Sequence, residues 1–305
     1  MWRGTSRAQP LRVIVQAAVA DCEGPNMSTG IRSAIDFYER HPISAQIILA
    51  KLEAARGTLD GLRPEDLFPH DQDHYGGLAA NDALAKCARL GSGTRMVDFC
   101  AGLGGPARYF ALRYGAVVTG IELTPARVAG AEELTRRVGL SGKVRVLAGN
   151  VMDVALPSAS QDAVISQEAL LHVPDVARAF AEAHRLLRPG GRFAFTNWVA
   201  HRPLADSDAR LLWDGMAAAT LISIDEHARH LREAGFEVEA VEDETGVWGA
   251  ILAERLAMYQ KLRGEAEQAG APAGHDAFYR SYVLFVALVQ SRAMGGARFT
   301  AVKAG

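Results

Sequence analysis

The sequence has few cysteines, no excess of either charge and no long hydrophobic run. Its three cysteines, Cys22, Cys87 and Cys100, are too few and too widely spaced for a disulfide framework or a zinc site, which favours a reducing cytoplasm. Lysine and arginine total 33 against 35 aspartate and glutamate, and this net charge of −2 gives no electrostatic basis for nucleic-acid binding. No apolar run approaches the roughly 20 residues of a transmembrane helix, so stable membrane association is not expected.

The first 26 residues differ from the rest of the chain. Three arginines precede the short apolar stretch Val13-Ile14-Val15, as in a secretory signal, but Gln16 interrupts that stretch. Met27 offers a start that would leave the preceding residues as an extension. We therefore expect residues 1–26 to lie outside the working fold and the protein to be cytoplasmic.

Hydrophobic spacing predicts secondary structure along the remaining chain. Helices are expected at 30–57, with a break at His41-Pro42 and with Ser44 and Gly57 capping the second piece, and again at 79–90 after a polar loop at 58–78. Strands are expected at 96–99, 116–121, 144–147, 163–166, 192–197, 236–241 and 297–303. Helices are expected between them at 106–114, 125–138, 175–188 and 224–234, and in two pieces over 248–295.

This alternation predicts an α/β fold with a doubly wound, Rossmann-like sheet of seven strands. N-terminal helices precede the sheet, and a helical insertion precedes its last strand. The corresponding segments are a helical lid segment at 27–90, a ligand-binding core at 91–247, a second helical lid at 248–295 and the final strand at 296–305.

A glycine-rich turn follows the first predicted strand. In Gly102-Leu103-Gly104-Gly105-Pro106 the glycines let backbone N–H groups approach a ligand closely, and Pro106 suits the start of a helix. Twenty residues past Gly102 the next strand ends at Glu122, where a carboxylate can accept hydrogen bonds from both hydroxyls of a ribose. The turn also fits the permissive dinucleotide pattern G-x-G-x-x-A, so a nicotinamide-dependent oxidoreductase stays open here.

The neighbourhood of this turn favours a different class, because Asp98 lies inside the strand end and Gly149-Asn150 follows the third strand. Residues 70–245 and the last strand resemble the class I S-adenosylmethionine-dependent methyltransferases. Within them, the chain is most similar to the small-molecule branch related to sarcosine/dimethylglycine N-methyltransferases. The motifs that carry the resemblance are His74-Tyr75-Gly76-Gly77-Leu78, Gly102-Leu103-Gly104-Gly105-Pro106-Ala107-Arg108-Tyr109, Thr119-Gly120-Ile121-Glu122-Leu123-Thr124-Pro125 and Val173-Pro174-Asp175.

The resemblance implies a role for each matching residue in binding S-adenosylmethionine. The methionine end of the donor would be held by Asp98, Cys100, Ala101, Gly102 and Gly104, with Gln167 beneath it. The adenosine end would be held by Glu122 at the ribose and by Leu123, Asn150 and Val151 at the adenine. Cys100 stands where the family usually has glycine, and Asn150 stands where aspartate is usual. Because an amide still offers an acceptor to the adenine amine, we expect altered affinity and retained binding.

Methyl transfer is an in-line displacement, so the protein needs to align donor and acceptor and exclude water under a lid. His74 and Tyr75, in the segment before the core, are the leading candidates for acceptor contact. A metal site at His70 and His74 with Asp71 and Asp73 stays an alternative, although the chemistry requires no metal.

Two further groups of residues are candidates for the acceptor side. Glu168 and His172 follow the fourth strand and form either an acid/base pair, a site for a cationic acceptor at Glu168, or merely a helix cap with a buried histidine. Aromatic side chains suit a cationic amine, with core packing as the alternative. The aromatic candidates are Trp198, Trp213, Trp248, Tyr279 and Tyr282. His227 and His230 are expected on the surface.

We therefore expect a methyltransferase that uses S-adenosylmethionine and acts on an amine nitrogen of a small molecule. Methylation of oxygen, sulfur or carbon and a lipid enzyme resembling cyclopropane-fatty-acid synthases remain alternatives. A nicotinamide-dependent oxidoreductase and a non-catalytic cofactor sensor are more distant ones. A homodimer is compatible with the sequence.

Overall fold

The computed structural model describes residues 25–41, 43–268 and 276–305. The predicted extension at 1–26 lies outside these residues apart from Pro25 and Asn26. Within the described parts, no helix combines the length and the hydrophobicity that a membrane crossing needs.

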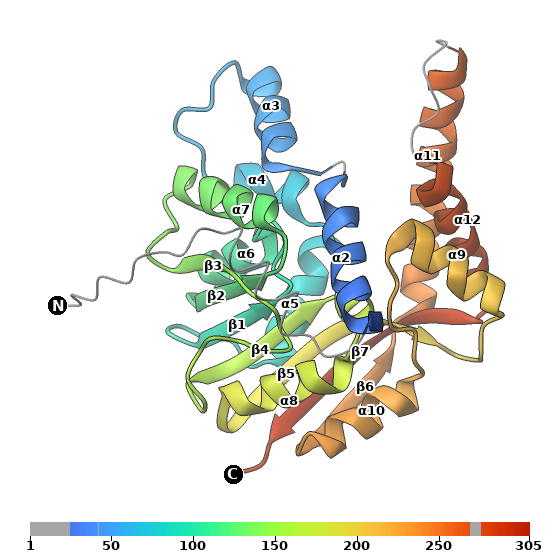
Figure 1. Ribbon diagram of the computed structural model, residues 1–305. Helices are drawn as coiled ribbons and strands as arrows, with labels where there is room; N and C mark the ends of the chain where they lie inside the picture. The colour runs from blue at the N-terminus through green and yellow to red at the C-terminus, as the bar shows by residue number, and fades with distance from the viewer. Residues whose placement is uncertain (1–24, 42, 269–275) are drawn as a thin grey trace.

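Seven strands form one mixed sheet in the order β3-β2-β1-β4-β5-β7-β6 (Figure 1). Strands β1 to β5 pair in parallel, and β7 runs antiparallel between β5 and β6. The predicted seven-stranded, doubly wound sheet is confirmed, including the last strand that follows a helical insertion. The strands are β1 (Arg95–Phe99), β2 (Val117–Glu122), β3 (Val144–Ala148), β4 (Gln161–Gln167), β5 (Leu187–Ala200), β6 (Phe236–Asp243) and β7 (Met294–Lys303).

Helices cover both faces of the sheet because successive strand residues point to opposite sides. The helices are α2 (Pro25–Glu39), α3 (Ala45–Arg56), α4 (Pro64–Asp71), α5 (Gly77–Cys87), α6 (Gly105–Tyr114), α7 (Pro125–Arg137), the 3₁₀ turn η1 (Leu170–His172), α8 (Val176–Leu186), α9 (Asp206–Met216), α10 (Ile224–Glu233), α11 (Thr245–Gln268) and α12 (Asp276–Gln290). On one face Phe110 of α6 packs with Met96 and Ile165. On the other face Phe180 of α8 packs with Val97.

Local signals set several helix ends as the sequence predicts. The Ser44 hydroxyl accepts a hydrogen bond from the Ile47 N–H at the start of α3, and Gly57 ends that helix in a left-handed conformation with φ of 76°. The predicted polar loop at 58–78 is wrong in part, because it contains α4. Pro64 begins this helix, and the Asp66 carboxylate accepts the N–H of Arg63. Helix α9 was also not expected from the spacing.

Helices α9, α11 and α12 form a separate apolar cluster with the end of the sheet. Trp198 of β5 stacks on Phe285 of α12 with ring centroids 3.6 Å apart, and Leu212 of α9 is buried in the same cluster. Figure 1 shows α11 and α12 side by side, projecting beyond the sheet at the upper right. The helical insertion therefore packs in its own apolar cluster, which includes residues of β5 and β7 at the end of the sheet.

The expectation that His227 lies on the surface is wrong. Its side chain is buried in α10, with one ring nitrogen 2.8 Å from the Ser223 carbonyl oxygen and the other 3.0 Å from the Asn197 amide nitrogen. The ring stacks on Phe299 of β7. Burial lowers the pKa of His227 to about 4. Because His227 lies in a helix rich in acidic and basic residues, no sequence pattern distinguishes a buried histidine at this position from a solvent-exposed one.

The buried His227 gives the protein a defined sensitivity to acid. Because its folded-state pKa of about 4 lies below the ordinary 6.5, the unfolded chain takes up this proton first as the pH falls. We expect this residue to lower the free energy of unfolding by roughly 3 kcal/mol between pH 6.5 and pH 4. Urea unfolding of the wild type and of His227→Gln at pH 7 and pH 4 measures the difference, since other titrating groups cancel. Equal acid sensitivity of the two proteins would contradict the assignment.

Candidate active site

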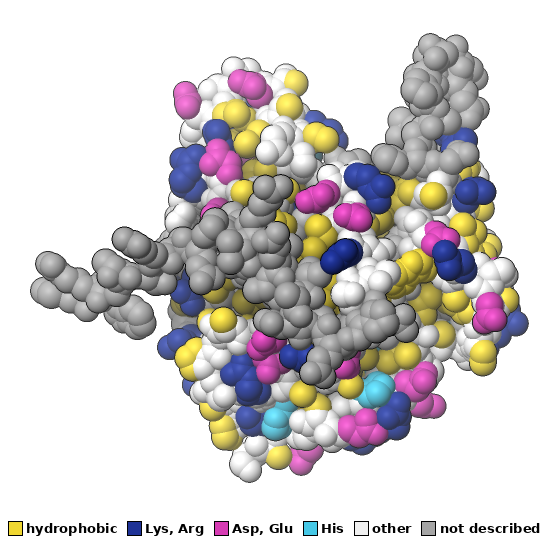
Figure 2. All heavy atoms as spheres, viewed as in Figure 1, with side chains coloured by type: hydrophobic (Ala, Val, Ile, Leu, Met, Phe, Trp, Pro, Cys, Tyr) yellow, Lys and Arg dark blue, Asp and Glu magenta, His cyan; other side chains and the backbone are white. Residues whose placement is uncertain are grey.

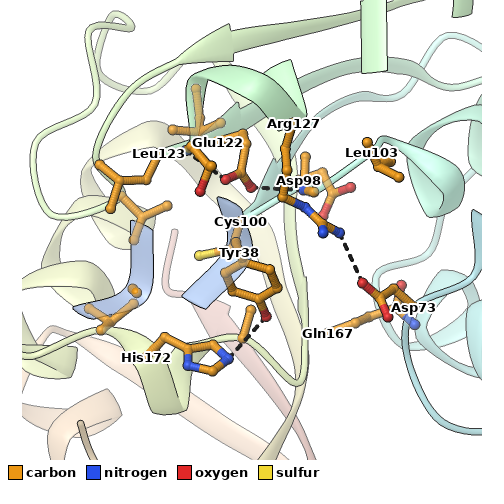
Figure 3. A pocket seen from close by; sticks show the side chains of 18 of the residues that line it. Tyr38, Asp73, Asp98, Cys100, Leu103, Glu122, Leu123, Arg127, Gln167 and His172 are labelled. Atoms are coloured by element: carbon orange, nitrogen blue, oxygen red, sulfur yellow. Dashed lines mark hydrogen bonds and ion pairs between the residues drawn. The ribbon is translucent and has the colours of Figure 1, made fainter. Parts of the chain in front are cut away.

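A cavity lies at the carboxyl ends of β1, β2 and β4, where the order of the strands reverses between β1 and β4 (Figure 3). Such switch points are where open α/β sheets bind their ligands. Strand register brings the functional ends together, since Phe99 of β1 lies beside Ile121 of β2 and Ser166 of β4. The cavity encloses about 1000 Å³, including space open to solvent. Helix α2 and the segment at 71–74 cover it.

Nine of the ten residues predicted to bind the cofactor line this one cavity. They are Asp98, Cys100, Ala101, Gly102, Glu122, Leu123, Asn150, Val151 and Gln167. The tenth, Gly104, is not among the lining residues and caps the start of α6 with φ of 73°. Residues from four strand ends therefore meet at one site.

The glycine turn and Glu122 are held to each other by hydrogen bonds. The carboxylate of Glu122 accepts the N–H of Gly102 at 2.9 Å and the N–H of Thr124 at 2.8 Å. A Cβ on Gly120 would come within 2.6 Å of the Ala101 side chain, so this glycine allows the turn to approach β2. Both oxygens of Glu122 are thus oriented at the cavity wall before any ligand binds.

Cys100 adopts the backbone conformation of the glycine that it replaces. Its φ is 60°, in the left-handed region that side chains with a Cβ rarely occupy. Burial raises the pKa of its thiol well above the usual value, with further increases from Glu122 and Asp98. The thiol therefore remains protonated at neutral pH, which fits a packing role and disfavours a nucleophile.

Several polar atoms at the methionine end of the predicted site have no hydrogen-bond partner among the described residues. They are Oδ2 of Asp98 and both amide atoms of Gln167. Burial, followed by the negative charge of Glu122, raises the pKa of Asp98 to about 8. Buried polar groups without partners are costly, and a ligand that carries an ammonium group would satisfy them.

Asn150 is already engaged within the protein. Its Oδ1 accepts the N–H of Met152 at 3.0 Å, which closes a short turn after β3. One lone pair of this oxygen and the amide NH₂ remain for a ligand. The replacement of the usual aspartate therefore leaves a weaker acceptor at this position.

Tyr38 and His172 form a hydrogen-bonded pair in the cavity lining. The ring Nδ1 of His172 lies 3.0 Å from the carbonyl oxygen of Ala217, to which it donates, so its Nε2 accepts the Tyr38 hydroxyl at 3.0 Å. Burial lowers the pKa of His172 to about 4 and raises that of Tyr38. Both groups are consequently uncharged at neutral pH. Figure 3 shows the two side chains joined by a hydrogen bond, with Tyr38 drawn between His172 and Cys100.

Sequence reasoning missed Tyr38. The residue continues the apolar stripe of Ile31 and Ile35 on α2, so its spacing indicates core packing. Its partner His172 is 134 residues away, and no local pattern connects the two. The predicted acid/base pair of Glu168 with His172 is not formed, because both ring nitrogens of His172 are bonded elsewhere.

Glu168 lines the cavity in a strained backbone conformation with φ of 53°. Its carboxylate accepts the N–H of Tyr75 at 2.8 Å. Burial raises the pKa of Glu168 to about 8, against the opposing effect of the Tyr75 N–H. This carboxyl group therefore changes charge close to physiological pH.

The two leading acceptor candidates are placed differently. His74 lines the cavity, with one ring nitrogen 3.1 Å from Oε1 of Gln72. Tyr75 is buried outside the lining, where its ring packs against Trp248 and beneath the guanidinium of Arg255. Tyr75 is connected to the site through its backbone N–H, which donates to the carboxylate of the cavity-lining Glu168.

The predicted aromatic walls lie outside the lining of this cavity. Trp198 and Trp248 are buried in the cluster around α12. Trp213 lies on α9 near Gly30. Tyr282 is buried in the same cluster, and Tyr279 lies beneath Arg263. Trp198, Trp248 and Tyr282 therefore have the core-packing contacts of the alternative interpretation, whereas Trp213 and Tyr279 are only partly buried.

In the alternative metal site at 70–74, the candidate ligand Asp71 is engaged in an ion pair instead. Asp71 and Arg108 are paired at 2.9 Å with both side chains fully buried. Across residues 25–41, 43–268 and 276–305, no three histidines, cysteines, aspartates or glutamates are grouped so as to hold a metal ion.

Known proteins with similar sequences and structures define the class. A family model described as a methyltransferase domain matches residues 97–195. The chain is 32% identical over 190 residues to 27-O-demethylrifamycin SV methyltransferase of Amycolatopsis mediterranei, covering 61% of this chain and 70% of that protein. It is 31% identical over 157 residues to sarcosine/dimethylglycine N-methyltransferase of Halorhodospira halochloris, covering 52% and 56%.

The fold is also shared with solved structures. Phosphoethanolamine N-methyltransferase 2 of Haemonchus contortus, solved with S-adenosylhomocysteine, superposes with a TM-score of 0.71 at 23% identity, covering 89% of this chain and 60% of that one. This likeness shows the fold alone. The chain spans about half the length of several sterol 24-C-methyltransferases that it also matches.

The sheet order, the glycine turn fixed to Glu122 and the cavity at the switch point are typical of α/β proteins that bind a nucleotide-like ligand at the carboxyl ends of their strands. The matches to known proteins identify the class of enzyme. The chain belongs to the S-adenosylmethionine-dependent methyltransferases. This confirms the class and the methyl donor that the sequence predicts, in place of a nicotinamide-dependent oxidoreductase.

The donor site allows a direct test at Glu122. Replacing Glu122 with glutamine removes the charge that would bind the ribose hydroxyls, and we expect the affinity for S-adenosylhomocysteine to fall by about 1–3 kcal/mol. Calorimetric titration measures the effect, with Glu132→Gln on the exposed side of α7 as the matched control. Unchanged affinity of the Glu122 variant would remove this residue from the site.

Proposed function

We propose that the protein transfers the methyl group of S-adenosylmethionine to an amine nitrogen of a small molecule bound beside Tyr38 and His172. The observation that carries this proposal is the uncharged Tyr38–His172 pair, which lines the same cavity as the glycine turn and Glu122. Enzymes commonly use such a positioned pair to move a proton during the reaction.

The donor would lie along the strand ends of this cavity. In our proposal Glu122 binds the ribose, and Leu123, Asn150 and Val151 surround the adenine. The methionyl end lies against Asp98, Gln167 and the turn formed by Cys100, Ala101, Gly102 and Gly104. The partnerless atoms of Asp98 and Gln167 support this placement, because the methionyl ammonium offers the donors that they lack.

The Tyr38–His172 pair would accept the proton that the acceptor must lose. An amine attacks the methyl group through its lone pair, so it must be uncharged when it reacts. The Tyr38 oxygen can accept the N–H of the acceptor while its own proton moves to Nε2 of His172. Because burial lowers the pKa of His172, Nε2 is unprotonated at neutral pH, and the positive charge on the acceptor nitrogen would drive the proton towards this weak base. His74 and Glu168 would complete the acceptor side, where a positive charge on the acceptor would favour the ionised form of the Glu168 carboxyl group.

A hydroxyl acceptor is the second candidate. The same pair could take the proton of a hydroxyl group, and the likeness to an enzyme named for 27-O-demethylrifamycin SV favours oxygen. The likeness to sterol 24-C-methyltransferases favours carbon in a lipid, but those proteins match over about half of their length.

We further propose a cytoplasmic protein without a nucleic-acid partner. Cys87 and Cys100 are free thiols. On the face in Figure 2, described basic and acidic side chains are intermixed, as the net charge of −2 leads one to expect. A homodimer is compatible with the sequence, and light scattering of the purified protein measures its oligomeric state.

S-adenosylmethionine with a deuterated methyl group tests the proposed reaction. After incubation with cell extract, mass spectrometry locates the label among small polar molecules, lipids and protein, and fragmentation identifies the labelled atom. Label on nitrogen of one small molecule supports the proposal. Label on oxygen selects the second candidate, whereas label confined to lipid overturns both.

A further inference from the structure

Arg127 is a buried cation whose hydrogen-bonding capacity is only partly used. It lies in the first turn of α7 and lines the cavity with 7% of its side chain exposed. Its Nη2 donates to Oδ2 of Asp73 at 2.9 Å. Its Nε and Nη1 have no partner among the described residues. A guanidinium buried with idle donors is costly unless a ligand satisfies them.

The surroundings of Arg127 hold its guanidinium in place at the wall of the cavity. Its guanidinium packs 4.7 Å from the centre of the Tyr38 ring, which fixes its plane. Gly102 faces it, and a Cβ there would come within 2.9 Å of Nη2. The absence of a side chain on Gly102 thus lets the glycine turn and the guanidinium approach each other closely at the cavity wall.

Partnerless acceptors face the same cavity. Oδ2 of Asp98 and Oε1 of Gln167 lack donors, whereas Nε and Nη1 of Arg127 lack acceptors. Figure 3 shows Asp98 and Arg127 near Leu103, and Gln167 lower in the view beside Asp73, the ion-pair partner of Arg127. An α-amino carboxylate carries both missing partners, an ammonium for the acceptors and a carboxylate for the guanidinium.

We propose that Arg127 binds the carboxylate of an α-amino acid head group in this cavity and that Asp73 competes for the same guanidinium. The carboxylate comes either from the methionyl end of the donor or from an amino acid acceptor. The inference rests on the proposed function, since it deepens the description of the same site.

The competition with Asp73 distinguishes this role from a structural one. If Arg127 only anchors the segment at 71–74, losing Asp73 breaks the same anchor and weakens binding as losing Arg127 does. If Arg127 binds a carboxylate, losing the Asp73 charge frees the guanidinium and leaves binding equal or tighter. Arg127→Met and Asp73→Asn therefore have opposite expected effects.

Calorimetry with two ligands tests the proposal without turnover. S-adenosylhomocysteine carries the amino acid head group, and 5′-methylthioadenosine lacks it. We expect Arg127→Met to weaken S-adenosylhomocysteine by roughly 10- to 100-fold, as for a lost charge-assisted hydrogen bond, with 5′-methylthioadenosine changed less than threefold. We expect Asp73→Asn to bind S-adenosylhomocysteine at least as tightly as the wild type.

A second titration separates the two sources of the carboxylate. If Arg127→Met leaves S-adenosylhomocysteine unchanged, glycine is titrated into the protein saturated with S-adenosylhomocysteine. Glycine binding that Arg127→Met abolishes assigns the carboxylate to the acceptor. No effect in either titration overturns the proposal, as does an equal loss of both adenosyl ligands in the Arg127 and Asp73 variants. A wild type that binds neither adenosyl ligand would instead overturn the proposed function.

Discussion

Replacing Tyr38 with phenylalanine is expected to lower kcat by about 100- to 1000-fold, the range for loss of a positioned proton acceptor. The change removes one oxygen and keeps the ring that packs on Arg127. The hydroxyl is the link between the cavity and Nε2 of His172. Steady-state kinetics with the acceptor found by isotope labelling measures the effect, and affinity for S-adenosylhomocysteine should stay within about threefold.

The two members of the pair should behave as one unit. Residues that act together lose activity together, so Tyr38→Phe with His172→Gln should be little slower than either single variant. Tyr114→Phe is the matched control, because the Tyr114 hydroxyl is also hydrogen-bonded, to Asp82, but lies outside the cavity lining. Multiplicative losses in the double variant would show that the two residues do not share a proton. A Tyr38 variant with normal kcat would remove the pair from the reaction.

The cavity lining that we propose for the donor could be predicted from sequence because its signals are local. The glycine turn and Glu122 are separated by one strand–helix–strand unit, and the parallel register that joins their strands is a property of the fold class. Cys100 shows how strong this constraint is, since it takes a left-handed conformation that its side chain disfavours. Position in the turn overrides residue preference.

The proposed acceptor side could be predicted only in part, because the hydroxyl that pairs with the candidate His172 comes from Tyr38, 134 residues away. Tyr38 meets His172, and Arg127 meets Asp73, only after α2 and the segment at 71–74 fold over the sheet. Each tyrosine or arginine alone fits an ordinary amphipathic helix. The tryptophans show the converse, since Trp198 suits a ligand wall by type and is used for packing. Only burial and contacts distinguish these uses.

The largest expected effect on stability comes from the ion pair of Asp71 with Arg108. Both side chains are fully buried, and Arg108 also donates to the hydroxyl of Thr135. Burial lowers the pKa of Arg108, whereas Asp71 opposes that shift. Replacing Asp71 with alanine leaves this cation without its counter-charge, and we expect the free energy of unfolding to fall by about 3–5 kcal/mol.

An apolar replacement of both residues tests the cause of that loss. Asp71→Leu combined with Arg108→Met removes both charges and keeps volume, so most of the lost stability should return, as measured by urea unfolding. Glu133→Ala, which breaks surface pairs with Arg136 and Arg137, is the control and should change stability by less than about 1 kcal/mol. A double variant as unstable as Asp71→Ala would mean that the hydrogen bonds matter more than the charge. A Cβ on Gly105 would overlap the carbonyl oxygen of Asp71. The glycine therefore lets the segment at 71–74 pack directly on the first turn of α6, where the ion pair with Arg108 holds it. The segment at 71–74, which covers the cavity, is therefore held in place by buried contacts of the fold.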